Sequence, residues 1–279
     1  MHTDRGTYQI RTPLQAEDFL YPCGEISAKS TKRVISLEAP IDAQEVLSTL
    51  DSSEQVALLL DASGLHAETV MYAEEKLFEF YSHIAEHADG RQLILIAPSA
   101  HLSRGLAALP PHREDPRFFF SFLTAALRTS AFGRVSLLLP NISSTAELAV
   151  IRRLIEQAMR SLLHRSHAFD EMVEIGLRID TPAAALLSKS LAEEVDFLTL
   201  ELDRLARLTL ADPSPEADQL CRNAEAVLHL AEIAVGNAHM LGRFMIAQGD
   251  MASNRRILPH LLSMGVDALA LPAPRHGQY

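Results

Sequence analysis

The chain has 279 residues, 48% of them hydrophobic, and its 36 acidic against 25 basic side chains give a formal net charge of −11. This acidic balance argues against nucleic acid as a partner, because phosphate contacts need clustered Lys and Arg. Cys23 and Cys221 lie too far apart for metal-ligand spacing, which favours a reducing compartment over a disulfide framework. No signal peptide and no run of 18 apolar residues are present, so we expect a cytoplasmic globular protein without a membrane span.

Eight short apolar runs rich in Val, Ile and Leu follow a polar leader, residues 1–32. Each run has the length of a strand and is mostly apolar on both parities, as expected for parallel strands that are buried on both faces. The expected strands are 33–39, 55–62, 92–98, 134–140, 173–180, 196–202, 243–249 and 268–274.

Longer amphipathic stretches separate these runs and predict helices over 42–50, 66–88, 116–131, 144–165, 182–195, 216–241 and 254–264. Ser144 and Glu147 have the spacing of a capping box, and Pro182 suits the first turn of a helix. The run FFFSFL at 118–123 is longer than a single core-facing stripe, so we expect part of it to meet a second protein surface.

The alternation of strands and helices predicts a (β/α)8 TIM barrel over residues 33–279, as a single domain without its last helix. The competing fold is an open doubly wound sheet. That fold would favour a glycine-rich phosphate loop after the first strand, and the sequence EAPIDAQ has none. The barrel is therefore the preferred prediction.

Polar residues follow several of the expected strands, at the rim where TIM barrels carry their chemistry. The alternative interpretation is that strand ends are polar in any fold. Arg178 shares a strand face with Asp180 and should point into the barrel, where its guanidinium needs a partner. Glu201 on the adjacent strand is the expected partner and Asp203 the second choice, while the alternative is that Arg178 binds an anion.

The second half of the chain resembles the C-terminal barrel of the phosphoenolpyruvate-utilising enzymes, most closely enzyme I of the sugar phosphotransferase system. Residues 33–120 follow this family only in the order of their elements. The matching stretches, in the family's order, are LRTSAFGRVSLLLPNISSTAEL (127–148), EIGLRIDTPAAAL (174–186), LAEEVDFLTLELDRLARLTLA (191–211), NAHMLGRFMIAQGDMASN (237–254) and LLSMGVDALALPAP (261–274).

The resemblance implies a phosphoenolpyruvate and Mg²⁺ site at the barrel mouth. In the family, arginines on early strands clamp the phosphate, a Glu and an Asp hold the metal, and a Cys acts as the acid. Guanidinium groups suit a highly charged phosphate, and Mg²⁺ prefers carboxylate oxygens. Relatives dimerise through this barrel, so the resemblance also implies a homodimer.

Most of these positions are substituted in this chain. Asp61 falls at the strand-two arginine and Ala97 near the strand-three arginine. Asp180 replaces the metal-binding Glu, and Gln248 replaces the catalytic Cys, so no catalytic residue is assigned. The family's Asn-Asp pair becomes Asp203 and Arg204. The candidate ligand-binding residues are Asp61, Arg178, Asp180, Glu201, Asp203, Arg204 and Gln248, and the candidate metal ligands are Asp180 and Asp203.

These substitutions predict a catalytically degenerate barrel that serves as a binding or regulatory module in a phosphotransferase context. We expect a weakly bound small anion, and a protein of that system as a partner. The chain carries no match to the family's phosphohistidine motif, so phosphoryl transfer would need a second polypeptide. Two alternatives stay open: a Mg²⁺-dependent enzyme acting on phosphoenolpyruvate or a 2-oxo acid, and a structural oligomerisation barrel.

Overall fold

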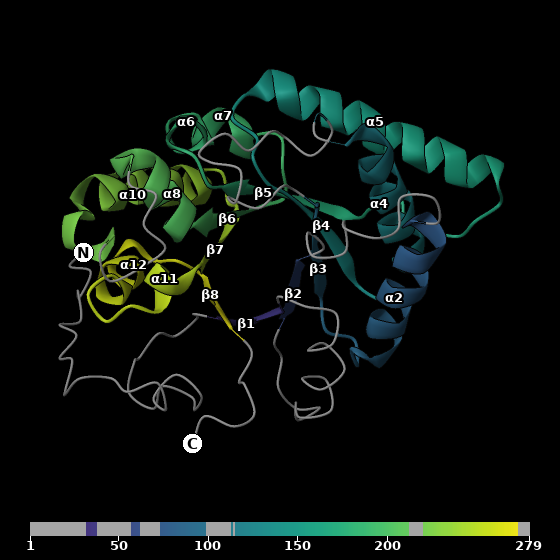
Figure 1. Ribbon diagram of the computed structural model, residues 1–279, viewed down its shortest axis with the longest axis horizontal. Helices are drawn as coiled ribbons and strands as arrows, with labels where there is room; N and C mark the ends of the chain where they lie inside the picture. Colours follow the sequence, from purple (N-terminus) through teal and green to yellow (C-terminus); the bar gives the residue numbers. More distant parts are fainter. Residues whose placement is uncertain are drawn as a thin grey trace, which may run out of the picture.

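The computed structural model describes residues 32–37, 57–61, 73–98, 113, 115–211 and 220–272. Eight parallel strands pair in sequence order, and β1 pairs with β8 to close the barrel (Figure 1). The strands are β1 (Lys32–Leu37), β2 (Ala57–Asp61), β3 (Leu93–Ile96), β4 (Val135–Leu139), β5 (Glu174–Ile179), β6 (Phe197–Glu201), β7 (Phe244–Gln248) and β8 (Ala268–Pro272). The predicted TIM barrel is confirmed, and its closure excludes the open doubly wound sheet.

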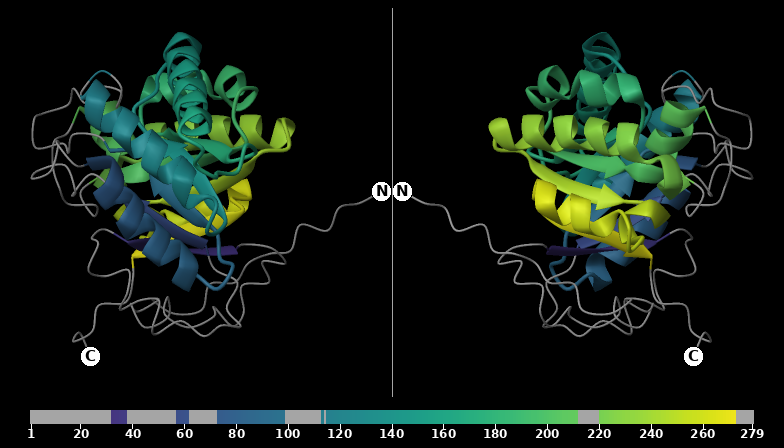
Figure 2. Two further views of the ribbon diagram at one scale, coloured as in Figure 1. Left: turned by 90° about the vertical axis from the view of Figure 1, so that its right-hand side faces the viewer. Right: turned by 90° about the vertical axis from the view of Figure 1, so that its left-hand side faces the viewer.

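Helices cover the outside of the strands (Figure 2). They are α2 (Ala73–His87), α4 (Pro116–Thr129), α5 (Thr145–His164), α6 (Pro182–Leu186), α7 (Ser188–Ala192), α8 (Leu202–Leu210), α10 (Glu225–Met240), α11 (Asp250–Ser253) and α12 (Leu258–Met264), with a 3-10 turn η5 (Cys221–Asn223). No helix in these described ranges is long and apolar enough to cross a membrane. Lys32, the last residue of the expected leader, begins β1; the rest of the leader, the expected helix over 42–50 and the chain after β8 lie outside the described residues.

Three differences separate these helices from the predicted ones. The single helix expected over 182–195 is divided at Leu187 into α6 and α7. Helix α8 was not predicted because it begins at Leu202, directly after the last residue of β6, with no intervening turn to mark it. Helix α11 was not predicted either, because its four residues are too few to show an apolar period.

Local capping explains where several helices begin. Ser144 accepts a hydrogen bond from the Glu147 amide at 3.2 Å, as the predicted capping box requires, but the Glu147 carboxylate accepts from the amide of Ser143, one residue before the cap, at 2.9 Å. Thr181 caps α6 in the same way, ahead of Pro182. These caps fix the connections that follow β4 and β5 at the rim.

The phenylalanine run in α4 packs into the core of the protein itself. Phe118, Phe119 and Phe122 are buried, and Phe120 packs partly buried against the same cluster. Because α4 packs between α2 and α5, both sides of the helix have partners within the chain. Phe120 and Ser121 are only partly buried, so the expectation that part of this run meets a second protein surface stays a prediction.

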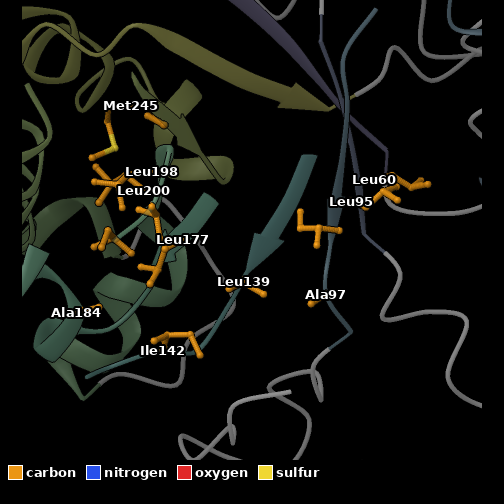
Figure 3. Packing of buried hydrophobic residues seen from close by; sticks show 14 of the residues in the cluster. Leu60, Leu95, Ala97, Leu139, Ile142, Leu177, Ala184, Leu198, Leu200 and Met245 are labelled. Carbon is orange, nitrogen blue, oxygen red and sulfur yellow. The ribbon is translucent and has the colours of Figure 1, made fainter. Parts of the chain in front are cut away.

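The strands separate two apolar layers. Residues of one parity pack between strands and helices, among them Leu177, Leu198, Leu200 and Met245 (Figure 3). Residues of the other parity fill the inside of the barrel: Val34, Leu59, Ile94, Ile96, Leu138, Phe197, Ile246, Ala268 and Ala270. A Cβ at Gly176 would lie 2.3 Å from the Phe197 ring, so the glycine leaves the room that this ring occupies.

A polar group closes the opposite, amino-terminal end of the barrel. Gln92 Nε2 donates to Ser136 Oγ at 2.7 Å and to Glu174 Oε2 at 2.6 Å, and the Ser136 hydroxyl donates to the same carboxylate at 3.1 Å. This polar group borders the apolar interior cluster at its amino-terminal end.

Candidate functional site

The inner face of the barrel becomes polar at the carboxyl ends of β5, β6 and β7. Thr199 and Glu201 share the parity of Phe197, and Gln248 shares that of Ile246, so these side chains continue the inward-facing rows. The strand register places Arg178 beside Thr199, and Glu201 beside Gln248. We call this wall, together with Asp180, Asp203 and Arg204, the polar mouth.

Asp180 is the central group of the polar mouth and has no solvent exposure. Its Oδ2 accepts hydrogen bonds from the Asn141 amide at 3.0 Å and from Arg178 Nε at 3.2 Å. Arg204 Nη1 lies 3.9 Å from the same oxygen. One buried carboxylate is therefore shared between two guanidinium groups.

Arg178 is buried as predicted, but its hydrogen-bonded partner is Asp180, where Glu201 was expected. Asp180 lies two residues further along the same face, so the guanidinium reaches it without crossing to the next strand. The Glu201 carboxylate instead accepts from Gln248 Nε2 at 3.0 Å. Burial lowers the Arg178 pKa, but the charges of Asp180, Glu201 and Asp61 outweigh it and leave that pKa raised.

The positive charge of Arg204 is less well compensated by nearby groups than that of Arg178. Arg204 lies in the first turn of α8 and is 5% exposed, and its Nε has no hydrogen-bond partner within the described residues. Burial lowers its pKa despite the Asp180 charge, and the neighbouring Arg178 charge adds to the effect. The guanidinium therefore lies in a site that favours an additional anion.

Glu201 lies in an environment that disfavours its negative charge. Burial raises its pKa from the ordinary value of 4.5 to about 7, the Asp203 and Asp180 charges act in the same direction, and the Arg178 charge opposes them. The carboxyl group is thus divided between its acid and its carboxylate form near neutral pH. Hydrogen-bonded to Gln248, it is able to give or take a proton inside the mouth.

Asp203 connects two neighbouring strand–helix units. It was expected to share the inward face of Glu201 at the end of the strand, but lies in the first turn of α8, because β6 ends at Glu201. Its two oxygens accept from the Asp250 amide at 2.5 Å and the Met251 amide at 3.0 Å, at the start of α11. Burial raises its pKa, and these two hydrogen bonds oppose the rise.

Gly249 makes this close arrangement possible. Its φ of 100° lies in the region that side chains rarely adopt. A Cβ there would lie 2.3 Å from Asp203 Oδ2 and 2.9 Å from Glu201 Oε1. The backbone after β7 can approach both carboxylates only because this residue has no side chain.

The structure brings most of the predicted residues together. Arg178, Asp180 and Arg204 form one ion-paired cluster, and Glu201 joins Gln248. Asp61 lies at the end of β2, and its charge contributes to the electrostatic environment of Arg178. Thr199, which is fully buried, was not among the predicted site residues, although its position two residues before Glu201 places it on the same face.

Mg²⁺ is the cofactor that the family resemblance implies, with Asp180 and Asp203 as its ligands. Asp180 Oδ1 is buried without a hydrogen bond, but the two guanidinium groups at Oδ2 oppose a nearby dication. Both oxygens of Asp203 already accept backbone hydrogen bonds. Among the described residues, no cluster of three or more His, Cys, Asp or Glu side chains has the placement of a metal site. The arrangement does not fit Mg²⁺ bound by this pair.

Residues 104–275 match the family described as "PEP-utilising enzyme, PEP-binding domain". The chain belongs to this family. The match covers more than half of the chain and includes every residue of the polar mouth.

Several curated relatives share this region. A phosphoenolpyruvate-protein phosphotransferase from Haemophilus influenzae is 32% identical over 218 residues, which are 72% of this chain and 38% of the relative. Multiphosphoryl transfer protein 2 from Escherichia coli is 25% identical over 220 residues, 72% of this chain and 26% of that protein. The chain thus spans well under half the length of these relatives.

Solved structures with little sequence similarity share the fold. A citrate lyase from Burkholderia xenovorans has a TM-score of 0.62 at 13% identity, covering 86% of this chain and 73% of that one. A malate synthase from Haloferax volcanii has a TM-score of 0.58 at 12% identity, covering 87% of this chain and 71% of that one. These likenesses support the barrel architecture.

Proposed function

We propose that this barrel is a catalytically degenerate binding or regulatory module of a cytoplasmic phosphotransferase system, and that it does not transfer phosphate from phosphoenolpyruvate. The observation that carries the proposal is the pairing of Asp180 with Arg178 and Arg204. Asp180 occupies the position that the family resemblance gives to a metal-binding carboxylate. Guanidinium groups take the place beside it that a metal ion would need.

Two further positions support the loss of phosphoryl transfer. Gln248 stands where the resemblance places the thiol acid, and its amide has no proton of comparable acidity to deliver. Asp61 stands where a phosphate-clamping arginine is expected, and its charge would repel phosphate. Loss of two charge-assisted contacts, each worth roughly 1.5–3 kcal/mol, would weaken phosphoenolpyruvate binding by about 10²-fold or more.

The relatives favour the phosphotransferase context. The curated proteins that share this region are named as phosphotransferases and as a multiphosphoryl transfer protein. A protein of such a system is therefore the partner that we propose for this chain. Self-association as a homodimer is a further part of the proposal, supported by the resemblance to enzyme I.

Phosphate transfer tests the proposal directly. The purified chain would be mixed with labelled phosphoenolpyruvate, Mg²⁺, and the phosphohistidine domain and carrier protein of a related system. The Haemophilus influenzae relative serves as the positive control. We expect no labelled protein above the buffer blank, and phosphoenolpyruvate affinity that is millimolar or weaker in calorimetry. Labelled carrier, or a micromolar dissociation constant, would contradict the proposal.

A further inference from the structure

Four buried polar atoms of the polar mouth have no hydrogen-bond partner within the described part of the chain. They are Asp180 Oδ1, Thr199 Oγ1, Arg204 Nε and Gln248 Oε1. None of these residues is more than 5% exposed. Buried polar groups in folded proteins almost always have a partner in protein or ordered water. Four such atoms on one wall therefore indicate a bound molecule.

The four atoms belong to one continuous surface. Thr199 pairs in register with Arg178, whose guanidinium contacts Asp180, and Arg204 reaches the same carboxylate. Gln248 lies on the next strand and donates to Glu201. Because β5, β6 and β7 are neighbours in the barrel, the four residues lie on one side of its mouth.

Arg204 indicates the charge of that molecule. Its guanidinium carries five N–H donors, yet within the described residues its Nε has no hydrogen-bond partner and its ion pair to Asp180 spans 3.9 Å. Asp180 already accepts a hydrogen bond from Arg178 and cannot fully compensate both cations. A buried charge without a partner is costly, and a carboxylate matches the guanidinium geometry. The missing partner is therefore an anion.

The acidic side chains of the polar mouth limit the negative charge that the bound molecule can carry. Asp61, Asp180, Glu201 and Asp203 already contribute acidic side chains around Arg178 and Arg204. A phosphate ester with two or three charges would meet more repulsion here than a single carboxylate. The unpartnered acceptors on Asp180 and Gln248 call for donors, which hydroxyl groups supply.

We infer that the polar mouth binds a small hydroxycarboxylate without a divalent metal. Its carboxylate contacts Arg204, and its hydroxyl groups donate to Asp180 and Gln248. This inference rests on the proposed function, because it names the ligand class of that binding module. One molecule thus supplies partners for the orphaned donor on Arg204 and for the orphaned acceptors on Asp180 and Gln248.

Titration with glycerate in EDTA tests the inference, since glycerate carries one carboxylate and two hydroxyls. Binding would be followed by calorimetry and by the ligand-induced rise in melting temperature. We expect saturable binding that added Mg²⁺ leaves unchanged. Acetate, which has no hydroxyl, should bind at least about tenfold more weakly, and so should multiply charged phosphoenolpyruvate.

Arg204→Gln is the decisive variant, and Arg153→Gln, on the exposed face of α5, is its matched control. We expect Arg204→Gln to lose glycerate affinity by at least about tenfold while melting no lower than the parent without ligand. A merely structural arginine would give the reverse: a lower melting temperature and unchanged glycerate binding. Arg153→Gln should match the parent in both measurements.

Three results would overturn the inference: no saturable glycerate binding in EDTA, equal binding by Arg204→Gln and the parent, or a glycerate-soaked crystal with ordered water only on the four atoms. The phosphate-transfer assay separates this inference from the proposed function. If labelled carrier forms, the proposed function fails. If no carrier is labelled and glycerate does not bind, this inference alone fails.

Discussion

Glu201→Gln should change how the stability of the barrel depends on pH. The folded pKa of Glu201 is about 7 against an ordinary value of 4.5, chiefly because the carboxyl is buried and lies near Asp203. Between these two values the folded protein holds a proton that the unfolded chain has released. Stability is therefore greatest at low pH and falls as the pH rises from about 5 through 7.

The size of the effect follows from the shift in pKa. Each unit corresponds to about 1.4 kcal/mol, so the full penalty for ionised Glu201 approaches about 3 kcal/mol above pH 8. Glutamine has a similar shape, cannot ionise, and its carbonyl can still accept from Gln248 Nε2. Relative to the parent, Glu201→Gln should gain less than about 1 kcal/mol at pH 5 and about 3 kcal/mol at pH 8.

Urea denaturation at pH 5, 6, 7 and 8 measures this difference. Far-UV circular dichroism is the suitable probe, because the chain has no tryptophan. Glu193→Gln, at an exposed position after α7, is the control and should differ from the parent by a constant amount. A constant difference for Glu201→Gln as well, or a variant less stable than the parent at pH 8, would refute the reasoning.

Three other substitutions test the packing around the mouth, each by denaturant unfolding. Arg178→Met should lower the free energy of unfolding by about 3–5 kcal/mol, because it removes the hydrogen-bonded cation of buried Asp180. Adding Asp180→Asn should recover only part of that loss, because it removes the buried negative charge but also the ion pair of Arg204; equal stability of the single and double variants would contradict this. Gly249→Ala should lower the free energy of unfolding by about 1–3 kcal/mol, because the φ of 100° strains a side chain and the added Cβ would clash with Asp203. An unchanged denaturation midpoint would show that the loop adjusts freely. Gly176→Ala should lower the free energy of unfolding by about 1–3 kcal/mol, because the added Cβ would clash with the Phe197 ring. Adding Phe197→Leu should restore part of that stability, and a double variant with no recovery would show that the strain lies elsewhere.

The barrel could be predicted from the sequence because its strands are apolar on both parities. All eight strands form where the runs of Val, Ile and Leu predicted them. Helix α8 could not be found in this way, because Glu201 and Leu202 join strand to helix directly and no Gly, Pro or Asn marks the change. The wrong position of Asp203 follows from that missed boundary.

The composition of the polar mouth was more predictable than its pairing. Strand parity correctly placed Arg178 inside the barrel, but the choice between Asp180 and Glu201 depends on side-chain reach within one face. That Asp203 accepts two amides of α11 depends on a loop conformation that the sequence pattern does not encode. Thr199 was missed because a lone hydroxyl in an apolar strand gives no motif.

The Phe197 ring, seated against Gly176, closes the axis of the barrel between its two polar ends. Among the described residues, this apolar layer leaves no hydrogen-bonded route from Glu201 to the Gln92–Ser136–Glu174 group on its other side. The polar side chains at the two ends of the barrel can therefore change independently during evolution. Substitutions in the polar mouth can change what the protein binds, while the hydrogen bond between Ser136 and Glu174 at the opposite end still holds β4 and β5 in register.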